Sequence, residues 1–199
     1  GLATHREVLW VASAMSEEDA VVAEEADGPV EVELEDYGYE VDLVVSAEDA
    51  YDAFYSVIAN PQLWFTQHYL WDLSNSPDIR ADEKWAWKYG YKVVNDDIAR
   101  EVLRQIEGRS DPLVMFHDYH LYTAPGIVRE AVPGAFLHHF VHIPWPQPDA
   151  WRILPRGWRE DIFNGLLSND IFGFHTSAYV HNFLDCCREL MGCEVDYRN

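Results

Sequence analysis

Two short segments of the sequence carry side chains whose types and spacing could do chemistry. HDYHL, at residues 117–121, places Asp118 between two histidines, and HIPWPQP, at residues 142–148, begins with His142. Aspartate and histidine can ligate a metal ion, exchange protons with a substrate, or bind the hydroxyl groups of a sugar. Histidines at strand ends can also be core residues with satisfied hydrogen bonds, so the surrounding sequence has to distinguish these alternatives.

A metal site is the weakest of these alternatives. Zinc-binding histidines on a helix favour a spacing of four residues, whereas HDYH starts at the end of a predicted strand. In an extended segment His117 and Asp118 point to opposite faces, so they would not bind one ion without a turn between them. We therefore predict that no metal ion or cofactor is bound. A histidine-rich metallohydrolase stays a minor alternative, which metal analysis would detect.

A sugar or sugar-phosphate site fits these segments better. Sugars need directional hydrogen bonds together with aromatic faces that cover the CH groups of the ring. A carboxylate such as Asp118 binds two hydroxyls, and a neutral imidazole such as His142 binds a third. The aromatic candidates are Tyr55, Trp64, Trp145 and Trp151. For His138 and His139, packing within a strand is the simpler interpretation.

From residue 111 onward, strand patterns alternate with helix patterns. Apolar segments predict three strands, at residues 112–116, 134–143 and 170–176. Helical periodicity predicts three helices, at residues 123–132, 157–168 and 177–192. This order indicates an α/β, Rossmann-like parallel sheet with helices on both faces, its first strand being buried on both sides. Ligands of such sheets bind beyond the carboxyl ends of the strands, where HDYH, HIPWP and FHT all lie.

The amino-terminal half should supply further elements of this sheet. We expect a short buried strand over residues 7–15 and helical structure over residues 81–108. Another helix is expected to begin at Ser46, as its cap, and to end before Pro61. Residues 16–45 mix acidic residues with valines, which predicts a small edge hairpin or a loose acidic insert.

The charge and the composition restrict the classes of partner. The chain has a net charge of -21, from 35 Asp and Glu against 14 Lys and Arg, which disfavours nucleic-acid binding. Because the acids are spread along a chain that is 14% aromatic, adaptation to high salt explains them better than an acidic tail does.

Neither a membrane-spanning segment nor a signal peptide is recognisable, which predicts a soluble, cytoplasmic protein. Its cysteines, Cys186, Cys187 and Cys193, are expected to be reduced and packed.

Together, several segments closely resemble trehalose-6-phosphate synthases, a family of retaining glucosyltransferases with two facing Rossmann-like domains. The segments are MFHDYHL, HHFVHIPWPQPDAWRILP, DIFGFHT and FLDCC, preceded by YSVIANPQLWFTQHY at residues 55–69. The match runs from about residue 46 to residue 192 in family order. It implies that residues 1–199 form a single acceptor-side Rossmann-like domain, the N-terminal half of a GT-B glycosyltransferase. That domain would be incomplete at its N-terminus, and the C-terminal nucleotide-sugar domain would be absent.

The resemblance also implies roles for individual residues. Tyr55 and Trp64 match the aromatic pair that binds the glucose 6-phosphate acceptor, and Asp118 matches the carboxylate that holds acceptor hydroxyls near the donor. His142 matches the histidine that contacts the donor glucose. Gly1 resembles a glycine of the family's GGL loop, whose backbone lies near the donor phosphates. The family's Ser-Asn-Arg strand, whose arginine binds the acceptor phosphate, has no counterpart in these residues.

The implied reaction is transfer of glucose from UDP-glucose, or a related nucleotide sugar, to glucose 6-phosphate, giving trehalose 6-phosphate with retention. The departing phosphate could accept the acceptor's proton, so no protein nucleophile is required. The family's charge-neutralising Arg and Lys lie in the other domain, so this chain alone should be nearly inactive. A glucosylglycerol-phosphate synthase and a non-catalytic sugar-phosphate-binding module are the alternatives, and a homo-oligomer stays open.

Overall fold

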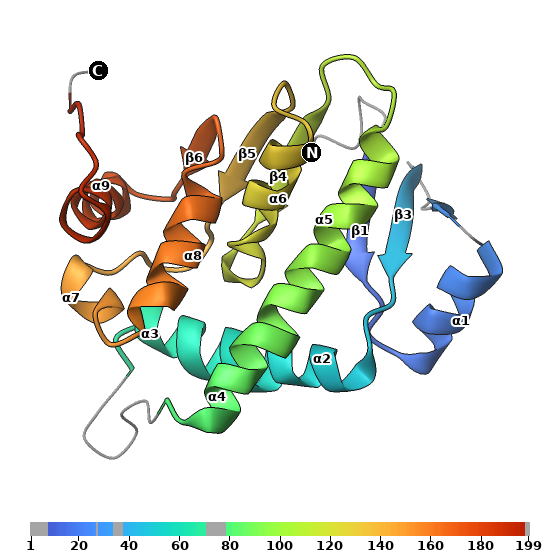
Figure 1. Cartoon of the computed structure of the whole chain (residues 1–199). Coiled ribbons are helices and arrows are strands. Elements are labelled where there is room, and N and C mark those ends of the chain that lie inside the picture. The colour runs from blue at the N-terminus through green and yellow to red at the C-terminus, as the bar shows by residue number, and fades with distance from the viewer. Residues whose placement is uncertain (1–7, 27, 34–37, 71–78, 198–199) are drawn as a thin grey trace.

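In the computed structural model, residues 8–26, 28–33, 38–70 and 79–197 are described. Their strands form two three-stranded sheets (Figure 1). The first sheet has the order β1 (Leu9–Ser13), β3 (Gly38–Val44) and β2 (Val30–Glu33). The second has the order β4 (Leu113–His117), β5 (Phe136–Phe140) and β6 (Ile171–Gly173).

The second sheet is parallel, as the alternating pattern predicted. β4 pairs with β5 in register from Leu113 and Phe136 to His117 and Phe140, and β6 continues the sheet beside β5. Three helices lie side by side in front of the strands in Figure 1. They are α5 (Lys92–Ile106), α6 (Ala124–Ala131) and α8 (Arg156–Leu166). This arrangement confirms the α/β fold class.

The strand β4 differs from its prediction in one respect. Val114 and Phe116 are buried in a core that includes residues of α5 and α6. The alternate residues Leu113 and Met115 are 56% and 38% exposed. Within the described residues, therefore, only one face of this apolar strand is covered, because its helices pack on one side. β1 is likewise less buried than expected, since Trp10 is 47% exposed.

The helix expected between Ser46 and Pro61 is longer than predicted. α2 (Glu48–Asp52) runs without a break into the π-helical segment η2 (Ala53–Trp64) and then into α3 (Phe65–Gln67). Pro61 lies inside η2 and is exposed, so the hydrogen bond that it cannot donate lies on the solvent side. Ser46 is not the cap, because its hydroxyl donates to Asp97 over 2.7 Å.

The remaining predictions had mixed outcomes. α4 (Ala81–Ala86), η3 (Trp87–Tyr91) and α5 form one continuous helical stretch, which confirms the prediction for residues 81–108. β2 and β3 form the expected antiparallel hairpin. However, β3 also pairs in parallel with β1, and α1 (Glu17–Ala26) was not predicted. Since α1 buries none of its residues, it lacks the apolar periodicity that would have identified it.

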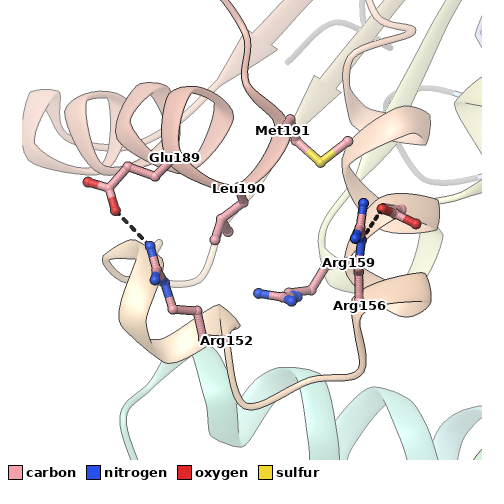
Figure 2. A pocket seen from close by; sticks show the side chains of 7 residues that line it. Arg152, Arg156, Arg159, Glu189, Leu190 and Met191 are labelled. Carbon is pink, nitrogen blue, oxygen red and sulfur yellow. Dashed lines mark hydrogen bonds and ion pairs between the residues drawn. The ribbon is translucent and has the colours of Figure 1, made fainter.

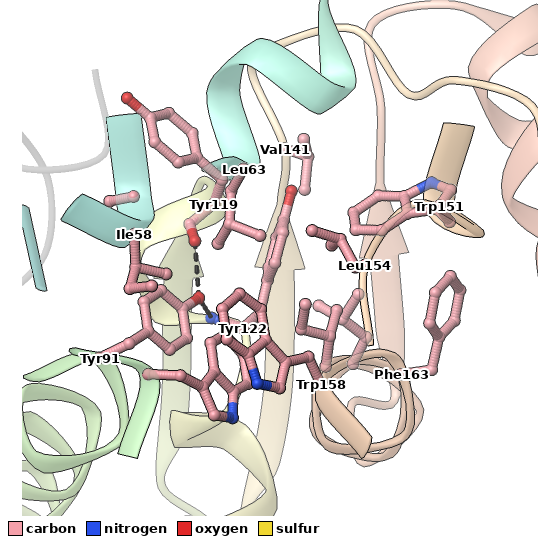
Figure 3. Close-up of a cluster of buried hydrophobic side chains, with 14 of the residues drawn as sticks. Ile58, Leu63, Tyr91, Tyr119, Tyr122, Val141, Trp151, Leu154, Trp158 and Phe163 are labelled. Atoms are coloured by element: carbon pink, nitrogen blue, oxygen red, sulfur yellow. Dashed lines mark hydrogen bonds between the residues drawn. The ribbon is translucent and has the colours of Figure 1, made fainter. Parts of the chain in front are cut away.

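The larger hydrophobic core lies where η2, η3, α8 and the segment after β4 meet (Figure 3). α9 (Ser177–Met191) contributes Cys186 and Cys187 to it, and Cys193 is half-buried. All three thiols are free, as expected, and burial raises the pKa of Cys186 and Cys187 to about 12. None of the described helices is both long and apolar enough to cross a membrane.

Candidate functional site

The carboxyl ends of β4 and β5 bring Asp118 and His142 together. The backbone N–H of His142 donates to Oδ1 of Asp118 over 3.3 Å. The backbone N–H of Asp118 in turn donates to the carbonyl of Phe140 over 2.8 Å. Both residues remain accessible to solvent. The two residues predicted to be catalytic therefore lie at one edge of one sheet, as the rule for parallel strands leads one to expect.

Asp118 has a strained backbone. Its φ of 63° and ψ of -176° fall in a region that glycine adopts almost exclusively. Such a conformation costs about 1–3 kcal/mol and persists only where the surrounding structure imposes it, most often at functional sites. Here the constraint comes partly from His139, whose Nε2 donates to the Asp118 carbonyl over 2.9 Å.

His139 is a buried, neutral imidazole. It is fully buried, and its Nδ1 has no hydrogen-bond partner among the described residues, so the proton resides on Nε2. Burial lowers the pKa of His139 to about 3, and the opposing effect of the bond to the Asp118 carbonyl does not offset it. The predicted packing of this histidine in its strand is confirmed. Its hydrogen bond to Asp118 was not foreseen.

Replacing His139 with glutamine is expected to remove a pH dependence from the stability of the chain. The pKa of His139 is about 3 in the folded chain and about 6.5 in the unfolded chain. Between these two pH values, therefore, the imidazole is protonated only when the chain is unfolded. The stability due to neutral His139 is therefore complete above pH 6.5 and is lost as the pH falls, by about 1.4 kcal/mol per pH unit.

Glutamine is the informative replacement because its amide can still donate to the Asp118 carbonyl but does not titrate. Urea unfolding from about pH 7 to about pH 5 should show a flatter profile for His139→Gln than for the unchanged chain. Parallel profiles would mean that His139 does not carry this dependence.

The backbone of His142 bonds to Asp118, and its imidazole ring bonds to His117. Nδ1 of His117 and Nε2 of His142 form a hydrogen bond of 3.2 Å. The ring of Trp10 stacks on His117 with centroids 6.3 Å apart. Burial, then the neighbouring His142 and His138, lowers the pKa of His117, while Asp118 opposes this shift. His117 is therefore neutral at neutral pH and can orient the His142 ring without adding charge.

A second wall of the site comes from η2 and the turn that follows β4. Tyr55 is 38% exposed and stacks on His120, with centroids 6.0 Å apart and rings 11° from parallel. The Tyr119 hydroxyl donates to Oδ1 of Asn60 over 2.8 Å. Figure 1 shows the helical segment of η2 crossing below the carboxyl ends of the strands. Tyr55 therefore lies on the same side of the sheet edge as Asp118.

The π-helical geometry explains how Tyr55, Asn60 and Trp64 share one face. Buried positions in this segment recur as pairs, at residues 53–54, 58–59, 62–63 and 66–67. That interval fits the roughly 4.4 residues per turn of i→i+5 bonding. Residues 55 and 64 are then about two turns apart, whereas in an α-helix of 3.6 residues per turn they would lie on opposite faces. Trp64 is half-buried, and its ring lies tilted against that of His68 with the ring centroids 4.1 Å apart.

Two buried side chains form hydrogen bonds with the backbone of the turn after β4. The hydroxyl of Tyr91 donates to the Tyr119 carbonyl over 2.7 Å and accepts from the N–H of Tyr122 over 3.1 Å (Figure 3). Nδ2 of Asn95 donates to the His120 carbonyl over 2.9 Å. Both Tyr91 and Asn95 are fully buried. The backbone that carries Asp118 is therefore attached to the helix η3–α5 and is rigid.

Other predicted site residues are placed differently. Trp145 and Trp151 are fully buried in the core and cannot cover a sugar ring, so these two candidates are excluded and core packing is the correct interpretation of both. Both rings pack against Phe163 of α8, which the sequence alone could not reveal. Gly1 lies outside the described residues. Among the residues that the structure describes, no group of three or more His, Cys, Asp or Glu side chains could hold a metal ion.

The comparison with known proteins concerns the chain as a whole. The sequence profile of glycosyltransferase family 20 matches residues 1–199. The chain is 31% identical over 191 residues to the "Validamine 7-phosphate valienyltransferase" of Streptomyces hygroscopicus subsp. jinggangensis, covering 92% of this chain and 37% of the relative. It is 33% identical over 190 residues to the "Bifunctional trehalose-6-phosphate synthase/phosphatase" of Thermoproteus tenax, covering 96% and 24%.

A solved structure supports the same fold. It is described as "Trehalose-6-phosphate from E. coli bound with UDP-2-fluoro glucose", and it superposes with a TM-score of 0.70 over 96% of this chain and 45% of that one. Its sequence is 22% identical, so the likeness concerns the fold alone. The chain thus spans less than half the length of each of these proteins.

Proposed function

The chain belongs to glycosyltransferase family 20, and from this premise we propose that it forms the acceptor-binding part of a retaining glucosyltransferase. The observation that supports this most is the strained Asp118 beside His142 at the carboxyl edge of the sheet. Strain of this kind is retained where it serves a site, and a carboxylate with an adjacent imidazole suits the hydroxyls of a sugar.

We propose the following roles for the residues of the site. The Asp118 carboxylate accepts hydrogen bonds from hydroxyls of glucose 6-phosphate, while the Tyr55 ring covers the CH face of that sugar. His142, oriented by His117 and by its own backbone bond to Asp118, faces the glucose of the nucleotide-sugar donor. Trp64 lies on the same face of η2 as Tyr55 and extends the aromatic wall.

In this proposal the chain contributes positioning. An acceptor hydroxyl held beside the leaving diphosphate attacks the donor carbon from the face that the diphosphate leaves, and the departing phosphate takes the proton. The new glycosidic bond forms as the bond to the diphosphate breaks, so no group on the protein becomes covalently attached. Neither a metal ion nor a cofactor is required by these steps.

Two acceptors are considered, glucose 6-phosphate and a glycerol phosphate. The Streptomyces relative is named for validamine 7-phosphate, while the Thermoproteus relative is named for trehalose 6-phosphate synthesis. The shared chemistry is a phosphorylated ring with several hydroxyls. A glycerol phosphate acceptor, which lacks a ring, would leave Tyr55 without a face to cover, so we favour glucose 6-phosphate.

Calorimetric titration of the 199-residue chain with glucose 6-phosphate tests this proposal. Tyr55→Ala is expected to weaken binding by about tenfold, because it removes the ring that covers the sugar. The matched control is Tyr89→Ala, since Tyr89 is also exposed, at 46%, but lies on η3 and packs against Trp85 with the rings tilted. Equal effects of the two substitutions, or no saturable binding, would reject the proposed acceptor site. Stronger binding of glycerol 3-phosphate would favour the alternative.

A further inference from the structure

A pocket lined by arginines lies away from the candidate site. Its volume is about 460 Å³, and it is bordered by Arg152, which follows α7 (Pro148–Trp151), by the first turns of α8 and by the last turn of α9. Arg152, Arg156 and Arg159 all contribute to its lining (Figure 2). None of these residues contacts Asp118, His142 or Tyr55 in the interactions described above.

Arg159 is the unusual member of this group. Figure 2 shows its guanidinium extending between Arg152 and Arg156. Its Nε is buried and has no hydrogen-bond partner among the described residues. Arg152 and Arg156, by contrast, are bonded to Glu189 over 3.0 Å and to Glu160 over 2.7 Å. A buried donor of a charged group without an acceptor is rare in folded proteins, and an anion bound beside it would supply the acceptor.

The local charge has the opposite sign to that of the chain. Three arginines and two glutamates give this pocket a formal charge of +1, in a chain whose net charge is -21. The two ion pairs are exposed at their arginine ends, where such pairs contribute little and exchange partners readily. An anion entering the pocket could therefore recruit Arg152 and Arg156 as well as Arg159. The first turn of α8, which carries Arg156 and Arg159, also favours negative charge.

We propose that this pocket binds a phosphorylated small molecule through its phosphate group. Guanidinium groups bind phosphate oxygens with two parallel hydrogen bonds, and three of them surround this space. Leu190 and Met191 form the opposite wall, which suits the carbon part of a phosphate ester (Figure 2). The volume falls in the usual range for small-molecule sites and is too small for a folded partner. The inference does not depend on the proposed transferase activity.

Titration of the full 199-residue chain with inorganic phosphate at constant ionic strength tests this proposal. Amide NMR signals of Leu190 and Met191 are expected to shift in a saturable way. Arg159→Gln should weaken binding by about tenfold, the effect of losing a charge-assisted bond to phosphate. Arg100→Gln is the matched control, because Arg100 is an exposed arginine on α5 that pairs with Asp96. That control should bind phosphate as the unchanged chain does.

Circular dichroism establishes that each variant is folded before its affinity is interpreted. If Arg159→Gln does not fold, Arg156→Gln takes its place, because the Arg156 side chain is 84% exposed and contributes little to packing. The proposal is overturned if no saturable shift appears, or if the pocket variants and Arg100→Gln bind equally. Shifts confined to the signals around Tyr55 and Asp118 would likewise overturn it, since they would report the candidate site instead.

Discussion

Asp118→Gly and Asp118→Ala are both expected to lower glucosyl transfer by about a hundredfold or more, because each removes the carboxylate that we propose positions the acceptor. The two variants should differ in stability. Glycine adopts the φ of 63° freely, whereas alanine keeps the strain, so the glycine variant should have the higher free energy of unfolding, by about 1–3 kcal/mol. A residue whose replacement relieves strain yet removes activity is retained for function.

The activity of these variants is measured in a protein in which residues 1–199 are followed by the remaining part of the Thermoproteus relative. The matched control is Asp111, which also has a positive φ, of 54°, but precedes β4 at the opposite end of the strand. Asp111→Gly should likewise exceed Asp111→Ala in stability while leaving transfer unchanged. Unchanged transfer in both Asp118 variants would remove this carboxylate from the site.

The position of Asp118 relative to His142 could be predicted from the sequence. The prediction needed only two buried strands, a parallel connection between them and the rule that ligands lie beyond their carboxyl ends. The strands and the helix that connects them are recognised from the spacing of apolar residues along the chain. The register that places His117 opposite Phe140 follows once the strands pair.

The aromatic wall was predicted only in part, because its geometry depends on the type of helix. Tyr55 and Trp64 were identified by resemblance. They are nine positions apart, which would place them on opposite faces of an α-helix. The helix was expected to end before Pro61, yet Asn60 and Pro61 both lie within η2, where Asn60 accepts a hydrogen bond from Tyr119. Proline is a strong local signal for a helix end, and the packing of the buried pairs on either side of Pro61 outweighs it.

The choice among tryptophans could not be made from composition. Trp10 is 47% exposed beside His117, whereas Trp145 and Trp151 are fully buried. HIPWP placed Trp145 only three residues after His142, which made it a plausible ligand contact. Its burial results from α8 and α9, whose Phe163 and Phe183 pack against it. Burial of one residue thus depends on elements remote in sequence, which periodicity does not specify.

The 199-residue chain alone is expected to bind glucose 6-phosphate but to show no measurable glucosyl transfer. The transition state places developing negative charge on the leaving diphosphate, and loss of even one group that stabilises such charge costs about a hundredfold to a thousandfold. The candidate site offers no such cation among its described contacts. Burial lowers the pKa of His117 and of His120, so both imidazoles are uncharged at neutral pH. In this proposal the chain orients an acceptor, while the described residues of the site supply little charge to neutralise the diphosphate.

Release of UDP from UDP-glucose in the presence of glucose 6-phosphate measures this transfer. The purified chain is compared with the chain extended by the part of the Thermoproteus relative that follows the matched segment. Extension should raise the rate by about a thousandfold or more, since it supplies the charge that the diphosphate needs. Turnover by the purified chain at a rate near that of the extended protein would show that the described residues already stabilise the leaving group. The proposed separation of acceptor positioning from charge neutralisation would then be wrong, although Asp118 would still lie beside His142.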